Sequence, residues 1–138
     1  MRKTLLLPIL LFVLSCNKSG DENCTTSAAS LAGSYKVIAS KYKQTPAATE
    51  EDLYAAMEAC EKDDVITLKT NGTYEAKDLG AVCSPSNDDS GTWSYSGSGL
   101  MLDGEPVTVK SFNCKTLVLV TSNAFLQGDA ITLTLQKQ

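Results

Sequence analysis

Five cysteines are the residues of this sequence with the greatest capacity for chemistry, and no histidine accompanies them. The chain of 138 residues has Cys16 near its start, followed by Cys24, Cys60, Cys83 and Cys114. The lack of histidine excludes Ser-His-Asp and Cys-His catalysis and every His-ligated metal site. A Cys₄ zinc site is not expected either, because the cysteines form no CxxC-like pair. The thiols are therefore candidates for lipid attachment and for disulfides.

Two acidic pairs, Asp63-Asp64 and Asp88-Asp89, are the other candidates for chemistry. Ca²⁺ prefers several carboxylate and carbonyl oxygens, but neither pair has the spacing of an EF-hand loop, and acidic turns are commonly just solvated. The sequence also shows no nucleophile beside a base and no carboxylate pair in an apolar setting. We therefore predict no metal site, no cofactor and no enzymatic activity.

The charge of the chain argues against a nucleic-acid partner. Without residues 1–15 the chain has 10 lysines, no arginine and 16 acidic residues, which gives a net charge of −6. The lysines are scattered, whereas a nucleic-acid surface needs a basic stripe. The remaining length suits one domain with a modest core.

The first fifteen residues have the layout of an export signal. Arg2 and Lys3 precede an apolar run over residues 5–14, which is shorter than the roughly 20 residues of a membrane span. The run ends in Val13-Leu14-Ser15-Cys16, which resembles the lipobox of bacterial lipoproteins. In that family the signal is cut before the cysteine, whose thiol receives diacylglycerol. The resemblance implies a Cys16 held in a membrane by two or three acyl chains.

The alternative is an ordinary signal peptide cut nearby, with Cys16 a disulfide partner. On the lipoprotein interpretation, residues 16–30 form a polar tether that cannot bury enough apolar surface to fold. Asp21-Glu22 loosely resembles the acidic signal that accompanies surface display in some Gram-negative bacteria. We therefore expect an exported protein anchored in the bacterial outer membrane, at its periplasmic face or at the cell surface.

The rest of the chain is a succession of short segments that alternate between apolar and polar residues or are rich in β-branched residues. This pattern predicts strands over 33–42, 64–70, 73–78, 91–96, 100–103, 106–112, 115–122 and 130–137. Asn71-Gly72 between the second and third strands favours a type I′ hairpin, in which both central residues have positive φ.

One segment breaks the strand pattern. Residues 45–64 are rich in Ala and Glu, with Leu53, Met57 and Cys60 at helical spacing. We predict a helix from about 50 to 61, capped by Thr49 with Asp52 as its capping-box partner.

The order of the strands favours one of the three possible disulfide pairings. In an antiparallel meander the odd connections lie at one end and the even ones at the other. Cys60 and Cys83 lie in long odd connections, while Cys114 lies in the sixth connection and Cys24 precedes the first strand. We predict Cys60–Cys83 and Cys24–Cys114, because a mixed pairing would cross the length of the sheet.

Several of these motifs together resemble a known family. The stretch "LAGSYKV" (31–37) looks like the first-strand Gly-x-Trp element of lipocalins, with Tyr35 where Trp is usual. The run from Cys60 through "DDVITLKTNGTYEA", Cys83 and "SGTWSY" to "LMLDG" is similar to small bacterial lipocalin-like domains. The resemblance covers about residues 31–137. It implies an all-β fold, an eight-stranded antiparallel up-and-down (calycin) barrel that binds a small apolar molecule.

Alternation along the strands predicts which side chains point into the barrel. The candidates for a ligand lining are Tyr35, Ile66, Leu68, Tyr74, Trp93, Tyr95, Leu102, Val109, Leu119 and Leu133. Five further residues are expected to point inward: Val37, Leu100, Val107, Leu117 and Leu135. The same side chains can instead fill a solid core. Leu53, Tyr54 and Met57 are expected to form either a lid over the long-loop end or a fixed plug.

The leading hypothesis is a lipid-anchored envelope protein whose barrel, in a domain over residues 31–138, holds or carries a small, partly apolar ligand. The alternative is an envelope interaction module with a solid barrel, which works through its loops on a protein partner. A cavity lined by aromatic residues would favour the first, and a filled interior with exposed apolar loops would favour the second.

Overall fold

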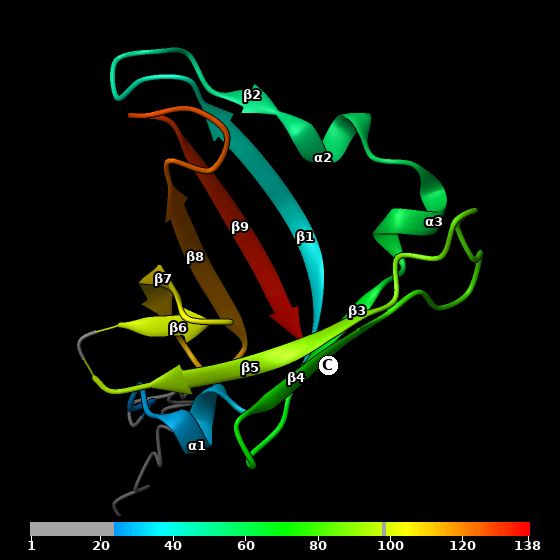
Figure 1. Cartoon of the computed structure of the whole chain (residues 1–138), viewed down its shortest axis with the longest axis vertical. Helices are drawn as coiled ribbons and strands as arrows, with labels where there is room; N and C mark the ends of the chain where they lie inside the picture. The colour runs from blue at the N-terminus through cyan, green and yellow to red at the C-terminus, as the bar shows by residue number, and fades with distance from the viewer. Residues whose placement is uncertain (1–23, 98) are drawn as a thin grey trace, which may run out of the picture.

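The computed structural model describes residues 24–97 and 99–138 (Figure 1). The predicted export signal 1–15, the predicted acyl acceptor Cys16 and most of the predicted tether lie outside the described residues. No helix within the described part of the chain is both long and apolar enough to cross a bilayer.

The described chain forms one antiparallel sheet that closes into a barrel. Its eight main strands are β1 (Gly33–Lys43), β3 (Val65–Leu68), β4 (Thr73–Lys77), β5 (Asp89–Tyr95), β6 (Leu100–Leu102), β7 (Glu105–Phe112), β8 (Thr116–Ser122) and β9 (Ala130–Lys137). Each pairs with the next along the chain, and β1 pairs with β9 from Tyr35–Lys137 to Lys43–Ala130, which closes the cylinder. The predicted all-β up-and-down barrel is therefore confirmed.

The barrel is splayed at one seam. β1 pairs with β3 only over Gly33–Tyr35, while near its other end it pairs with the two-residue strand β2 (Glu51–Asp52). The helices α2 (Leu53–Ala56) and α3 (Ala59–Lys62) lead from β2 back to β3 along this seam (Figure 1). The insert between the first two main strands thus covers the place where the sheet opens.

The single helix predicted over 50–61 is wrong in its extent. Glu51 and Asp52 extend the edge of β1 instead, and the Asp52 side chain, rather than Thr49, caps α2 by accepting from the Ala55 N–H at 3.0 Å. Glu58 then starts α3 and shares a capping box with Glu61. Sheet pairing and the second cap therefore divide the segment into two helices of one turn each.

The type I′ turn expected at Asn71-Gly72 is also wrong. Only Gly72 has positive φ, at 84°, and its N–H bonds to the Lys69 carbonyl at 3.1 Å. The Asn71 side chain accepts from the N–H of Thr73 at 3.0 Å, so residues 70–72 form a three-residue loop with a glycine bulge. Both central residues have positive φ at Asp103-Gly104, between β6 and β7.

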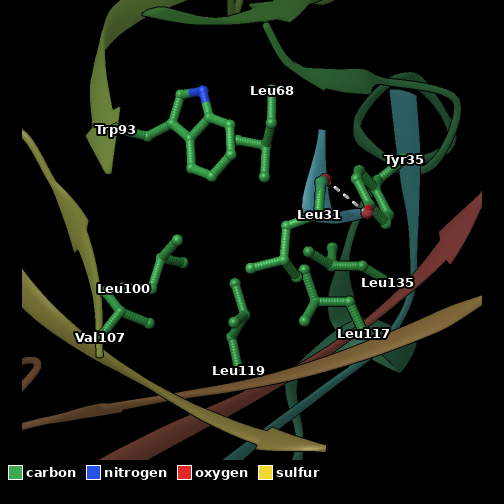
Figure 2. Packing of buried hydrophobic residues seen from close by; sticks show 9 residues of the cluster. All are labelled: Leu31, Tyr35, Leu68, Trp93, Leu100, Val107, Leu117, Leu119 and Leu135. Atoms are coloured by element: carbon green, nitrogen blue, oxygen red, sulfur yellow. Dashed lines mark hydrogen bonds between the residues drawn. The ribbon is translucent and has the colours of Figure 1, made fainter. Parts of the chain in front are cut away.

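A compact apolar cluster fills one end of the barrel (Figure 2). It consists of Leu31, Tyr35, Leu68, Trp93, Leu100, Val107, Leu117, Leu119 and Leu135. All of these except Leu31 were expected to point inward, and the other predicted inward residues pack against the cluster. Folded structure therefore starts earlier than residue 31, because α1 (Ala28–Leu31) lies under the barrel and places Leu31, fully buried, in the cluster.

Hydrogen bonds fix this closed end. The Tyr35 hydroxyl donates to the Leu31 carbonyl at 2.7 Å, and burial raises the pKa of Tyr35 to about 12. The Trp93 indole donates to the Lys69 carbonyl at 2.8 Å, and the Lys137 ammonium donates to the Ser30 carbonyl at 2.7 Å. Each polar tip that enters the cluster thus has a partner, as burial requires.

Leu31→Ala is expected to destabilise the barrel by about 3 kcal/mol, because a fully buried leucine leaves a cavity that its neighbours refill only in part. Urea denaturation followed by circular dichroism measures this. Leu79→Ala, at a leucine that is 47% exposed, is the matched control and should change the unfolding free energy little. Equal losses in the two variants would show that α1 is not part of the core.

Both disulfides agree with the sequence prediction. Cys24–Cys114 joins the segment before α1 to the turn between β7 and β8, and Cys60–Cys83 joins α3 to the loop between β4 and β5. The two cross-links therefore hold opposite ends of the barrel.

Candidate functional site

The barrel encloses a cavity of about 190 Å³ above the closed end. The residues that line it are Tyr35, Ile66, Leu68, Tyr74, Ala76, Asp89, Leu100, Leu102, Leu119, Leu133 and Leu135. The wall of the cavity is almost wholly apolar, because these residues come from the inward-facing positions of seven strands. The volume is smaller than the roughly 300–1,000 Å³ of sites for drug-sized ligands. It exceeds the roughly 150 Å³ cavity that takes benzene in another protein, so it suits a single ring or a short chain.

Seven of the ten residues predicted as ligand-lining candidates border this cavity, and Trp93, Tyr95 and Val109 do not. Trp93 belongs to the closed end, where its indole is bonded to Lys69. Tyr95 and Val109 border a separate open depression beside the β5–β6 turn. The cavity therefore occupies only the part of the barrel between the closed end and the long-loop rim.

Leu100 and Leu135, which the sequence placed only among the inward residues, also line the cavity, whereas sequence reasoning missed Ala76 and Asp89 altogether. Both missed residues continue the alternation of inward-facing positions along their strands, since Ala76 follows Tyr74 by two residues and Asp89 precedes Trp93 by four. β5 begins at Asp89 rather than at residue 91, which turns the Asp89 carboxylate toward the cavity. Extending each strand's period to its turn would have identified both residues.

A phenol and two carboxylates form the polar rim of the cavity. The Tyr74 hydroxyl lies 2.7 Å from Oδ2 of Asp103 and 3.2 Å from Oδ2 of Asp89. Asp103 reaches this position from the β6–β7 turn because Gly91 has no side chain: a Cβ there would collide with the Asp103 carboxylate. The Asp103 Oδ1 accepts from the Thr92 N–H at 2.7 Å, which fixes the turn to β5.

These contacts set the charge of the rim. Hydrogen bonds from the Thr92 backbone and from Tyr74 hold the pKa of Asp103 below its usual value. The hydrogen bond to Asp103, together with burial, raises the pKa of Tyr74 above its usual value. The phenol therefore stays protonated and Asp103 stays ionised, so the mouth of the cavity is acidic.

The proposed lid residues lie beside the barrel rather than in its cavity. Leu53, Tyr54 and Met57 are half-buried, and none of them lines the cavity. α2 lies along β1 near the long-loop end (Figure 1), and the Lys62 ammonium lies 5.2 Å from the centre of the Tyr54 ring. Whether this insert moves as a lid stays a prediction.

A cluster of three carboxylates lies at the corner that Cys60–Cys83 fastens. Candidate ligand atoms of Asp63, Asp64 and Asp78 lie within 4.8 Å of one another. Asp78 is 8% exposed and accepts from the N–H groups of Cys83 and Asn87 at 2.9 and 3.0 Å. One buried oxygen each of Asp63 and Asp64 has no hydrogen-bond partner. Both aspartates of the first acidic pair thus join Asp78.

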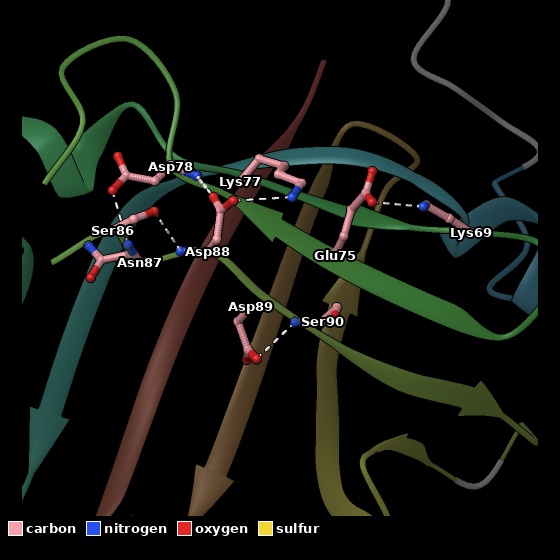
Figure 3. Close-up of polar contacts among 9 residues, drawn as sticks. All are labelled: Lys69, Glu75, Lys77, Asp78, Ser86, Asn87, Asp88, Asp89 and Ser90. Atoms are coloured by element: carbon pink, nitrogen blue, oxygen red, sulfur yellow. Dashed lines mark hydrogen bonds and ion pairs between the residues drawn. The ribbon is translucent and has the colours of Figure 1, made fainter.

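The second acidic pair is divided between two environments. Asp88 accepts from the Asp78 N–H at 2.9 Å and pairs with the Lys77 ammonium at 3.2 Å, and Figure 3 shows Asp89 turned away from both.

Burial first, and then the charges of Asp78 and Asp63, raise the pKa of Asp64. Ionisation of Asp64 is therefore disfavoured in the three-carboxylate cluster.

Asp64→Asn is expected to stabilise the protein at pH 7 and to lose this effect under acid conditions. A carboxyl whose pKa is raised by folding binds its proton more tightly in the folded state, so its ionisation at rising pH removes stability. Asparagine removes that charge. Thermal unfolding midpoints of the two proteins, compared between pH 7 and pH 3, test the prediction. A variant that is less stable at pH 7 would contradict it.

Comparison with known proteins agrees with this architecture. The family model described as a lipocalin-like domain matches residues 31–119, which is more than half of the chain. A search of curated proteins found no match. The matched residues run from the end of α1 into β8 and include most of the cavity wall.

Proposed function

The chain belongs to the lipocalin-like domain family, and from that premise we propose that it is a lipid-anchored binding protein of the bacterial cell envelope. Its barrel holds or carries a small, partly apolar ligand. The enclosed cavity is the observation that supports this most strongly, because walls of leucine and isoleucine with one polar rim suit such a molecule. The protein works without a cofactor and without catalysis.

Two features support the cellular placement. The first sixteen residues have the pattern of a lipoprotein signal, which makes acyl chains on Cys16 the membrane partner. Two disulfides in a chain of this size are typical of an oxidising compartment outside the cytoplasm. We place the protein at the outer membrane, on its periplasmic face or at the cell surface.

The anchor is tested by intact mass spectrometry of protein purified from its native membrane. We expect a chain that begins at Cys16 and carries a diacylglyceryl group, and a Cys16→Ser variant that leaves the membrane fraction. A chain that begins elsewhere without acylation would contradict the anchor and leave the barrel's function untouched.

The ligand is tested on the same preparation. Native mass spectrometry in mild detergent should show a small molecule that leaves the protein on unfolding, and extraction should identify it. Protein that copurifies with no small molecule, and that binds none of a set of short apolar compounds, would contradict a carrier function.

A second candidate function is docking to an envelope protein through the loops. Phe125 is 68% exposed and Leu126 is 55% exposed on the loop between β8 and β9. This loop is fixed, because the buried Asp129 accepts from the N–H of both residues. Exposed apolar side chains on a fixed loop suit a protein partner. Phe125→Ser with Leu126→Ser should then abolish cross-linking to that partner without changing ligand binding.

A further inference from the structure

The cavity offers a ligand hydrogen-bond acceptors rather than donors. Apart from aliphatic side chains, its lining contains only Tyr35, Tyr74 and Asp89. The Tyr35 hydroxyl donates to the Leu31 carbonyl at 2.7 Å, so its one proton is already engaged. The polar end of a ligand therefore has to be placed at the rim.

At that rim two carboxylates share the proton of one phenol. The Tyr74 hydroxyl is within hydrogen-bond distance of Oδ2 of both Asp103 and Asp89, but a phenol donates one proton at a time. The other oxygen of each carboxylate already accepts from the backbone, from Thr92 at 2.7 Å and from Ser90 at 2.8 Å. The two Oδ2 atoms thus have one donor between them, and the phenol oxygen accepts from neither carboxylate.

Nearby lysines do not supply these donors. Lys69 pairs with Glu75 at 2.8 Å, and Lys77 pairs with Asp88 at 3.2 Å. Figure 3 shows both pairs along β4, with Asp89 directed elsewhere. The negative charge of the rim therefore faces the opening of an apolar cavity without a cation from the neighbouring strand.

We propose that the ligand is a small organic cation, with an apolar body the size of one ring or a short chain and a primary or secondary ammonium group. This assignment rests on the proposed binding function. The body fills the cavity beside Leu102 and Leu133, and the ammonium donates to Asp89, Asp103 and Tyr74. An ammonium group offers two or three hydrogen-bond donors, whereas the Oδ2 atoms of Asp89 and Asp103 have only the phenol proton of Tyr74 between them.

The position of the charge makes this arrangement favourable. Asp89 is exposed, so the ammonium keeps part of its hydration and avoids the full cost of burying an ion. A carboxylate ligand of the same size would meet two like charges at the same point. A neutral alcohol would bury the same apolar area but would add only one donor.

The test compares 1-hexylamine, 1-hexanol and hexanoate on the purified full-length protein. Binding is followed by the methyl NMR signals of Leu102 and Leu133, which report the cavity itself. We expect hexylamine to bind roughly tenfold more tightly than hexanol, as hydrogen bonds to charged groups allow, and hexanoate to bind weakest. Asp89→Asn removes one of the two rim carboxylates and should bring the ratio of the amine and alcohol dissociation constants closer to one.

Glu50→Gln removes the same charge from an exposed residue ahead of β2 and is the matched control. It should keep the wild-type ratio, which separates the rim from the overall negative charge. Hexanol binding without a preference for the amine would overturn the cation assignment and leave the proposed binding function standing. Failure of all three compounds to shift the two signals would overturn both. The wild-type series alone decides these outcomes, so the test does not depend on the folding of a variant.

Discussion

Replacing Cys24 and Cys114 by serine is expected to lower the free energy of unfolding by about 4 to 5 kcal/mol. The bond joins residues 90 positions apart and so closes a loop that holds six of the eight main strands. Loop-closure entropy in the unfolded chain grows with that length. Because small domains are stable by only about 5 to 15 kcal/mol, the variant should be close to unfolding at 37 °C. Urea denaturation of variant and wild type measures the difference.

The second disulfide is the matched control for this experiment. Cys60 and Cys83 are 23 positions apart, so their replacement by serine should cost about 3 kcal/mol. The long-range bond also holds the segment ahead of α1, which places Leu31 in the core. A smaller loss for the Cys24–Cys114 variant than for the Cys60–Cys83 variant would show that the closed end does not depend on this cross-link.

Ala76→Phe is expected to weaken the binding of short apolar ligands by at least about tenfold, since a benzyl group would occupy much of the 190 Å³ cavity. Ala76 lines the cavity in β4, between Ile66 on β3 and Asp89 on β5. Calorimetric titration with 1-hexanol measures the loss. Overpacking costs about 1 to 3 kcal/mol at most sites, so the unfolding free energy is measured alongside.

Ser94→Phe adds the same bulk at an exposed position of β5 and controls for a general effect of the aromatic ring. It should bind hexanol as the wild type does. If the Ala76→Phe protein is folded and binds hexanol with unchanged affinity, the ligand lies outside the barrel, and the loop-docking function becomes the better account.

The strands were the part of this fold that could be predicted most completely. Each predicted range agrees with the observed strand to within two residues at either end, because a barrel wall exposes one side of every strand and buries the other. The same regularity identified the inward residues and, through the order of the turns, the disulfide pairing.

Local signals failed where distant residues decide the conformation. Helical spacing over 50–61 could not show that Glu51 and Asp52 would pair with β1. The Asn71-Gly72 dipeptide could not show that its turn would start one residue earlier, at Lys69. In both cases hydrogen bonds to residues outside the motif decide the backbone conformation.

The contact of Asp103 with Tyr74 at the rim of the cavity lay beyond sequence reasoning for the same reason. Asp103 is 29 positions from Tyr74 in the sequence, and it reaches Tyr74 because Gly91 has no side chain where the Asp103 carboxylate lies. No periodicity connects these residues, and Asp89 had been grouped with Asp88 as a solvated turn. Only the closed barrel shows that the apolar lining ends in two carboxylates and a phenol.

A crystal structure of the protein soaked with 6-bromo-1-hexanol tests the central claim most directly, because bromine is located by its anomalous scattering. We predict a bromine peak inside the barrel among Leu102, Leu119 and Leu133, with the hydroxyl group toward Tyr74. An interior without density, in which these side chains have closed over the space, would contradict the claim that this barrel holds a ligand.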